Sequence, residues 1–141
     1  PTGAVFSIWT SAQDDRADVE KTPFGDWHWN ELMTADEKKA LAFYEAVFGY
    51  THDSINMGPQ GTYYLLKMGD AMRAGVMHSP MADTPPMWVP YVAVADCDAT
   101  AAKARTLGAQ LIVPPTDIPN VGRFATIIDA QGACIAFMKP S

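Results

Sequence analysis

One carboxylate in this sequence lies in a setting that could make it chemically active. The run WHWNELM holds Glu31 among aromatic and apolar residues, and Trp27, Trp29, Glu31 and Met33 occupy alternate positions. Alternate residues of a β-strand point to the same face, so a strand here would place the glutamate beside two indole rings. Such a carboxylate is desolvated, which disfavours its charged form and makes it a better proton acceptor. Glu31 is therefore the candidate general base.

We favour over this a structural role for Glu31, in which it pairs with an arginine or accepts a hydrogen bond from Tyr91. Arg123 follows a glycine at the start of an expected strand. There it could pair with Glu31, hold an acidic ligand or mark the rim of a site, and we favour a structural role. Further tyrosines supply aromatic surface. The candidate ligand-binding residues are Trp27, Trp29, Glu31, Tyr63, Tyr91 and Arg123.

The three histidines do not make an evident metal site. His28 falls on the opposite strand face from Glu31, and a shift of register by one residue would turn it to the same face. His28 is kept as the alternative metal ligand. His52 and His78 lie near strand ends with no carboxylate at ligand spacing, so we expect both to face solvent.

The net charge and the cysteine content limit the classes of molecule that the protein is expected to bind. The formal net charge of −6, with scattered acids, argues against nucleic acid or an anionic membrane as the partner. No apolar stretch approaches the roughly 20 residues that span a bilayer, and the apolar first residues lack the basic flank of a signal peptide. Cys97 and Cys134 form no CxxC pair, so reduced thiols in a cytoplasmic protein are expected. A small molecule remains as the expected ligand.

The clearest element is a helix within TADEKKALAFYEAVFGY. Thr34 is the expected N-cap, Glu37 its partner in a capping box, and Gly49 the left-handed residue at the end. A second, alanine-rich helix is expected over 98–108. Strands are expected at 26–33, 51–56, 62–68, 72–78, 87–96, 109–115, 123–129 and 133–138, with a turn over 116–122.

These elements repeat a single pattern. Residues 26–80 and 85–141 each read as βαβββ, and they align by the Ala35-Asp36 and Ala95-Asp96 steps before the helices. On that alignment Trp29 matches Val89, and Glu31 matches Tyr91. The predicted fold is α+β, with two βαβββ modules paired into one curved mixed sheet around a cup and the helices outside.

This arrangement resembles the vicinal oxygen chelate superfamily of glyoxalase I, bleomycin-resistance proteins and extradiol dioxygenases. The resemblance covers 26–141 and rests on WNELMTAD…ALAFYEAVFGY and on the later LGA…PPTDIP..GR.A…D..GA pattern. It is strongest to a glyoxalase-like subgroup with two such domains in one chain. The resemblance implies the cup, and in the metal-using branch it implies a divalent ion held there by His or Glu.

Carried over by position, those ligand positions hold other residues here. They fall on Trp29 and Val89 in the first strand of each module, on Ala136 in the last strand, and near Ala74 or Gly75 in module one. None of these side chains can coordinate a metal. We therefore expect no cofactor, with a divalent metal as the alternative.

Two functions remain open. The first is a metal-free binder of a small molecule in an aromatic cup, as in the bleomycin-resistance branch. The second is a glyoxalase- or dioxygenase-type enzyme, either with a displaced metal site through His28 and Glu31 or with Glu31 as a metal-free base.

The segment before residue 26 looks like the end of another domain. GAVFSIW (3–9) has the pattern of the closing GACIAFM, and 10–25 reads as a linker. We expect 3–9 to add as a strand to a sheet edge, of its own domain or of a partner chain. This favours a homodimer or a tandem-domain partner.

Overall fold

The computed structural model of the chain describes residues 1–13, 18–81 and 83–141. These residues form two compact units, one of 1–7 with 29–89 and one of 8–28 with 90–141. Each unit carries one βαβββ module, and the modules are described in turn. No helix among the described residues is long and apolar enough to cross a membrane.

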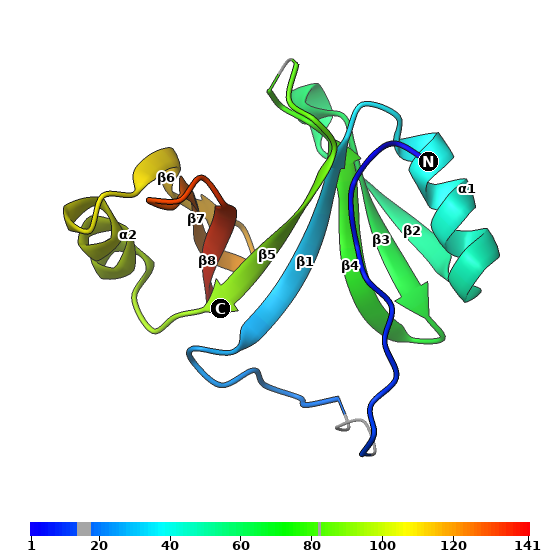
Figure 1. Ribbon diagram of the computed structural model, residues 1–141, viewed down its shortest axis with the longest axis horizontal. Coiled ribbons are helices and arrows are strands. Elements are labelled where there is room, and N and C mark those ends of the chain that lie inside the picture. The colour runs from blue at the N-terminus through cyan, green and yellow to red at the C-terminus, as the bar shows by residue number, and fades with distance from the viewer. Residues whose placement is uncertain (14–17, 82) are drawn as a thin grey trace. The chain divides into compact units, whose positions relative to one another are not determined.

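Module one places its helix between its first two strands. Its elements are β1 (Trp27–Thr34), α1 (Glu37–Phe48), β2 (Thr51–Asn56), the short 3-10 helix η1 (Gly58–Gln60), β3 (Thr62–Met68) and β4 (Ala71–His78). The strands lie in the order β2-β3-β4-β1, as Figure 1 shows. β3 is antiparallel to β2 and β4, whereas β1 runs parallel to β4.

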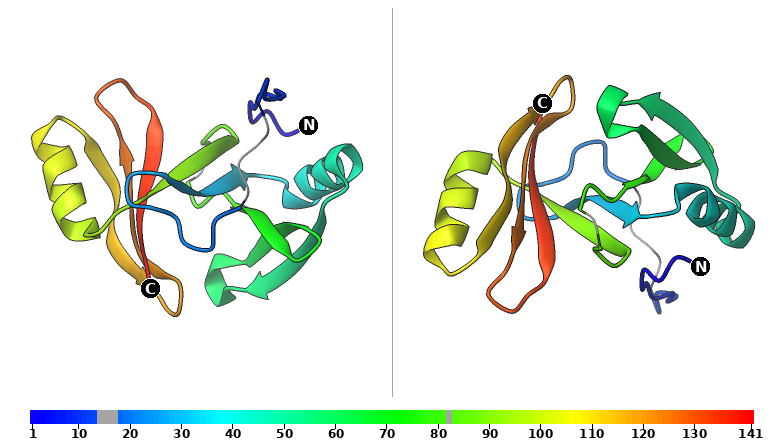
Figure 2. Two further views of the ribbon diagram at one scale, coloured as in Figure 1. Left: turned by 90° about the horizontal axis from the view of Figure 1, so that it is seen from below. Right: turned by 90° about the horizontal axis from the view of Figure 1, so that it is seen from above.

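Module two repeats this arrangement. Its elements are β5 (Met87–Ala93), α2 (Cys97–Thr106), β6 (Gln110–Ile118), β7 (Gly122–Ile128) and β8 (Cys134–Pro140). The strand order is β5-β8-β7-β6, with β5 parallel to β8 and the other pairs antiparallel. In each module the helix lies beside the strands that follow it in the sequence (Figure 2). The predicted α+β class with two βαβββ modules is confirmed.

The registers of the two parallel strand pairs correspond. Glu31 of β1 is paired with Gly75 of β4, and Tyr91 of β5 is paired with Ala136 of β8. These pairings are consistent with the predicted alignment of Glu31 with Tyr91. They also make Gly75, and not Ala74, the counterpart of Ala136.

Both helices begin at the aspartate of the repeated Ala-Asp step. The Asp36 carboxylate accepts a hydrogen bond from the backbone N–H of Lys39 at 2.9 Å, and Asp96 accepts one from Ala99 at 2.9 Å. The expected N-cap at Thr34 was wrong, because Thr34 is still the last residue of β1 and a carboxylate caps the helix well. The left-handed Gly49 at the end of α1 is confirmed, with φ of 70°.

Each module has its own apolar core. In module one the side chains of Leu32 and Leu66 are fully buried against Leu41 and Tyr44 of α1. Full burial of one leucine stabilises the fold by about 2 kcal/mol. In module two the buried cluster of Cys97, Ala101 and Ala125 is smaller, and partly buried Phe137 packs against it. Cys97 and Cys134 are both free thiols, as expected, and burial raises the pKa of each.

Residues 3–9 were expected to add as a strand to their own domain or to a partner chain. They form no strand within the described chain; the Phe6 ring packs on α1, 5.6 Å from the Tyr44 ring and 5.9 Å from the Phe48 ring. The pairing with a partner chain stays a prediction. The expected end of the strand at 115 was wrong, because β6 continues to Ile118 and takes in 116–118 of the turn expected over 116–122. Irregular register between Leu111 and Thr116 lets the strand carry its two prolines.

Candidate functional site

Three of the predicted site residues are joined by hydrogen bonds in module one. Trp29 and Glu31 lie two residues apart on β1, and Tyr63 lies on β3. The indole Nε1–H of Trp29 donates to the Tyr63 hydroxyl oxygen at 3.0 Å. The Tyr63 hydroxyl in turn donates to Glu31 Oε2 at 2.9 Å. We call this Trp29–Tyr63–Glu31 arrangement the relay.

The relay depends on a glycine in the strand between its members. Strand β4 lies between β3 and β1, so the Tyr63 side chain must pass over β4 to reach Glu31. It does so at Gly75, where a Cβ atom would overlap the Tyr63 hydroxyl and its ring carbon and would lie 3.2 Å from Trp29 Nε1. Any side chain at position 75 would therefore displace the tyrosine.

Burial and charge fix the protonation of the relay. Burial raises the pKa of Tyr63 far above its ordinary value, and the nearby charge of Glu31 raises it further. Tyr63 is therefore a neutral hydroxyl, and it donates its one hydrogen bond to Glu31. The Glu31 side chain belongs to a residue that is only 6% exposed. The hydrogen bond from Tyr63 supplies one oxygen of this buried carboxylate with a partner.

The other two aromatic candidates, Trp27 and Tyr91, belong to the second unit. Trp27 was expected on the same strand face as Trp29, but it is 63% exposed and belongs to the second unit. Tyr91 also belongs to that unit; it is buried, and its ring lies 6.4 Å from the Phe124 ring. The relay thus unites Trp29, Glu31 and Tyr63 within one module.

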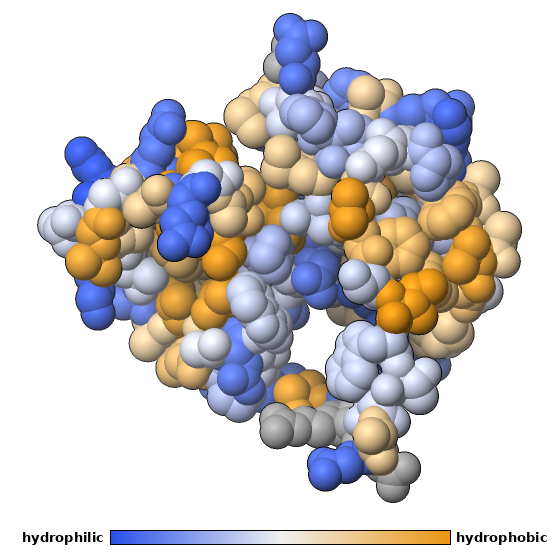
Figure 3. Space-filling view, in the orientation of Figure 1, coloured by the Kyte–Doolittle hydropathy of each residue, from blue (hydrophilic) through white to orange (hydrophobic). Residues whose placement is uncertain are grey.

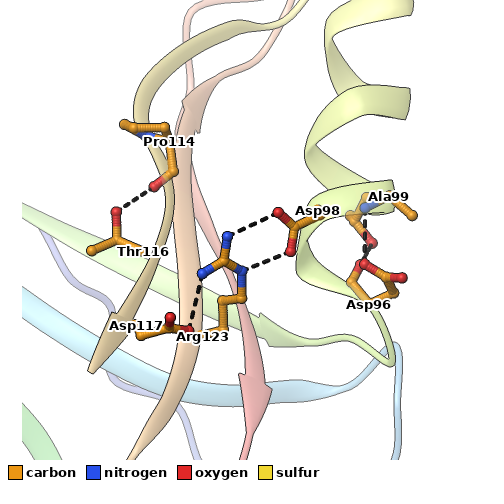
Figure 4. A network of polar contacts seen from close by, with 8 residues as sticks. Asp96, Asp98, Ala99, Pro114, Thr116, Asp117 and Arg123 are labelled. Carbon is orange, nitrogen blue, oxygen red and sulfur yellow. Dashed lines mark hydrogen bonds and ion pairs between the residues drawn. The ribbon is translucent and has the colours of Figure 1, made fainter. Parts of the chain in front are cut away.

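Arg123 belongs to an ion-pair cluster of module two (Figure 4). From β7 it donates two hydrogen bonds to Asp98 in the first turn of α2, at 2.7 and 2.9 Å, and its Nη1 lies 3.0 Å from Asp117 of β6. The guanidinium holds the pKa of the Asp98 carboxyl below its usual range. Arg123 therefore ties α2 to β6 and β7, which is a structural role with partners that the sequence did not identify.

The histidines have partners that the sequence analysis missed. The His52 and His78 rings pair with Glu45 and Glu37, both on α1, the second pair at 3.3 Å. Both histidines are exposed, as expected. Their glutamate partners could not be found by spacing in the sequence, because helix α1 lies over the strand ends. His28 Nδ1 lies 3.0 Å from the Thr22 hydroxyl. No group of three or more potential metal ligands occurs among the described residues.

The residues at the family's metal-ligand positions do not fit a metal ion. The lone pair of Trp29 Nε1 belongs to the aromatic system of the indole, so this nitrogen is a donor only and its N–H points to Tyr63. The space beside Gly75 holds the Tyr63 hydroxyl. Val89 and Ala136 are apolar and fully buried. Zinc, iron and nickel sites need imidazole, carboxylate or thiolate donors, and none of these four residues supplies one.

Gly75 is the functional residue that the sequence analysis did not identify. The only signal for it was the alignment of the two modules, which placed the missing ligand at Ala74 or Gly75 without saying what replaces it. The tyrosine that fills the place is distant in sequence, and its position follows from strand order.

Comparisons with known proteins show what the chain is similar to. Over all 141 residues the chain is 46% identical to the protein named "Putative glyoxylase CFP32" of Mycobacterium tuberculosis, of which it covers 54%. Over 135 residues it is 34% identical to the anthracycline biosynthesis protein DnrV of Streptomyces peucetius, covering 94% of the chain and 48% of that protein. The chain thus spans about half the length of these relatives. No family model matches the sequence.

Solved structures show the same fold. Methylmalonyl-CoA epimerase of Mycobacterium tuberculosis matches 82% of the chain and 87% of its own with a TM-score of 0.58 and 20% identity. A variant of the Streptomyces coelicolor epimerase matches 84% and 99% with a TM-score of 0.62 and 16% identity. A mutant 4-hydroxymandelate synthase from Streptomyces coelicolor matches 84% of the chain and 39% of its own, with a TM-score of 0.62 and 18% identity. With these relatives and this fold, the chain is a glyoxalase-like protein with the vicinal oxygen chelate fold.

Proposed function

We propose that this glyoxalase-like chain binds a small molecule at the relay without a metal ion. One observation carries the proposal: the Tyr63 hydroxyl takes the space that a side chain at position 75 would need, and it is held there by Trp29 and Glu31. Where the metal-using branch would place a metal ligand, this chain has a neutral hydroxyl and a carboxylate.

The chemistry of the relay suggests the class of ligand. Trp29 and Tyr63 present flat aromatic rings, which favour stacking with another planar ring. The Tyr63 proton is already committed to Glu31, so the relay offers acceptor oxygens and favours a ligand that brings its own hydrogen-bond donor. A planar ring with a hydroxyl group meets both conditions. Two relatives bear names that place them in anthracycline biosynthesis, and anthracyclines are fused planar rings with hydroxyl groups.

The binding test uses a dihydroxyanthraquinone as the probe. Elemental analysis of protein purified without chelators is expected to find no stoichiometric divalent metal. Titration with the probe is expected to raise the melting temperature by mass action and to quench tryptophan fluorescence. Tyr63→Phe should weaken binding about tenfold, as expected for about 1.4 kcal/mol lost from a charge-assisted network. Tyr64→Phe, on the next residue of β3, is the matched control and should bind normally.

Two results would contradict this proposal. Stoichiometric zinc, iron, nickel or manganese that survives dialysis would refute the metal-free site. Equal probe affinity in wild type, Tyr63→Phe and Tyr64→Phe would remove the relay as the place of binding.

An enzymatic function is the second candidate, because the relay contains the buried carboxylate of Glu31, which accepts a hydrogen bond from Tyr63. Glu31 would act as a general base, abstracting a proton from the bound ligand and returning it after rearrangement, as a lyase or isomerase requires. Glu31→Gln keeps the shape and removes the base. Turnover that falls at least a hundredfold would support this function, and unchanged turnover would exclude Glu31 as the base.

A further inference from the structure

The sheet face of module one that carries the relay extends beyond the relay to the next strands. Residues paired directly across neighbouring strands share a face, as alternate residues of one strand do. Leu65 of β3 is paired with Gly75 of β4, and Gly75 with Glu31, so Leu65 lies on the relay face. The apolar core packs on the other face, under α1, where hydrophobic residues gather (Figure 3). The relay face is therefore distinct from the face that α1 covers.

Strand β3 carries a row of three different side chains on the relay face. Tyr63, Leu65 and Lys67 alternate along the strand, and each of them is partly exposed. Leu66, on the α1 face, is fully buried. Ile55 of the edge strand β2 lies opposite Tyr63 and is 45% exposed. The row thus leads from the relay hydroxyl, past apolar side chains, to an ammonium group on a residue about 13 Å along the strand.

The ammonium group of Lys67 keeps hydrogen-bond donors for a ligand. Its Nζ donates to Asp53 Oδ2 on β2 at 2.9 Å, which uses one of its three N–H groups. The lysine side chain is 24% exposed, so its stem is largely covered, whereas the side chain of Asp53 is 62% exposed. An ion pair with a solvent-exposed partner is weak, so the anionic group of a bound ligand can join or replace the aspartate.

We propose that Lys67 is a specificity-determining residue, which binds an acidic group of a ligand whose hydroxyl group lies at the relay. This inference rests on the proposed function and narrows its ligand class. Hydrogen bonds of about 3 Å at both ends of the row leave about 7 Å between them, which is the length of about three fused rings. The ligand is then a planar ring system with a hydroxyl group at one end and a carboxylate at the other. Its rings lie over Leu65 and Ile55, and its carboxylate accepts a charge-assisted hydrogen bond from Lys67.

The test compares danthron, a dihydroxyanthraquinone, with rhein, the same molecule carrying one carboxylic acid. Affinities are measured by the quenching of tryptophan fluorescence. The wild-type chain is expected to bind rhein about tenfold more tightly, because only rhein can form the charge-assisted hydrogen bond. Lys67→Gln should bring the two affinities to within about twofold of each other, and Lys67→Arg should retain the preference. Lys103→Gln removes an exposed cation from α2 and is the control, which should keep the full preference.

Asp53→Asn gives a readout that a purely structural ion pair would not move. It removes the carboxylate that competes for Lys67, so the preference for rhein should rise about twofold at low salt. Equal affinity for the two compounds in the wild type would overturn this inference, and so would a preference that persists in Lys67→Gln or falls in Asp53→Asn. The proposed function fails instead if Tyr63→Phe binds danthron as tightly as the wild type does, so the two can fail separately.

Discussion

The two modules carry the same strand register but place their polar chemistry differently. In module one the paired positions are Glu31 and Gly75, and the relay covers them. In module two the corresponding pair is Tyr91 and Ala136. Ala136 is fully buried, and it carries the methyl group that Gly75 lacks. One missing methyl group, at Gly75, is what lets a tyrosine from a neighbouring strand reach the carboxylate.

Module two instead keeps its charged network at the surface. Arg123 joins Asp98 and Asp117 there, and both carboxylates are more than half exposed. Surface ion pairs contribute little to stability, whereas a buried hydrogen-bonded group is costly to leave without its partner. The comparison therefore predicts that equivalent substitutions will cost more in module one than in module two.

The largest effect is expected at Gly75. The added methyl group of Gly75→Ala would overlap Tyr63, so the relay must separate or the strands must move. We expect the free energy of unfolding to fall by about 3 kcal/mol, measured by urea denaturation. Ala136→Gly, the reverse change at the matching position of module two, should cost only about 1 kcal/mol.

A double-variant cycle identifies the cause. The Tyr63 ring carbon also overlaps the added methyl group, so Tyr63→Phe would not relieve the clash, but Tyr63→Leu would. In the Tyr63→Leu background Gly75→Ala should cost less than about 1 kcal/mol. Equal costs in both backgrounds would show that Gly75 is needed for another reason.

The next effect is the loss of the relay hydroxyl. Tyr63→Phe leaves the Trp29 N–H and a Glu31 oxygen without this partner in a buried setting. The free energy of unfolding should fall by about 2 kcal/mol, as measured by urea denaturation. Tyr64→Phe changes the same chemical group one residue away and should cost under about 0.5 kcal/mol. Similar losses for both variants would contradict the special role of Tyr63.

The architecture could be predicted from the sequence because local signals agree there. Helical periodicity, the Ala-Asp steps and Gly49 each indicated the elements of a βαβββ repeat. The helix start was misplaced because Thr34 and Asp36 are both good caps, and only the end of β1 decides between them. Residues 3–9 form no strand within the described chain, because strand propensity depends on a partner and Phe6 packs on α1.

The site was predicted only in part, for a reason of geometry. Alternation along β1 placed Trp29 and Glu31 on one face, and this prediction needs only the sequence of a single strand. The contact with Tyr63 requires the order of three strands and an absent Cβ at Gly75, which no spacing in the sequence encodes. The partners of His52 and His78 were missed for the same reason, because their glutamates lie on α1 and reach the strand ends only in the folded chain.

Alkaline pH should destabilise the protein through module one. Burial raises the pKa of Tyr63, and to a lesser degree that of Tyr44, so the folded chain holds these protons when tyrosines of the unfolded chain lose theirs. The stability they contribute is complete below about pH 10 and falls as the pH rises above it. The difference in urea midpoint between about pH 8 and pH 11 should be smaller in Tyr63→Phe than in the wild type. An unchanged difference would contradict the raised pKa of Tyr63.

Acidic pH should destabilise the protein through module two, and this effect should be weaker than that of alkaline pH on module one. The hydrogen bonds from Arg123 lower the pKa of Asp98, so its contribution is present above about pH 4, the value of an unfolded aspartate, and is lost as the pH falls. Asp98→Asn should therefore be less sensitive to a drop from neutral pH to about pH 3 than the wild type is. The effect should be smaller than that of any substitution in the relay and should shrink in high salt, because the pair is exposed to solvent. Asp70→Asn serves as the control for loss of one surface carboxylate. If Asp98→Asn changed stability more than Tyr63→Phe does, the contrast between a buried network in module one and a solvent-screened one in module two would be wrong.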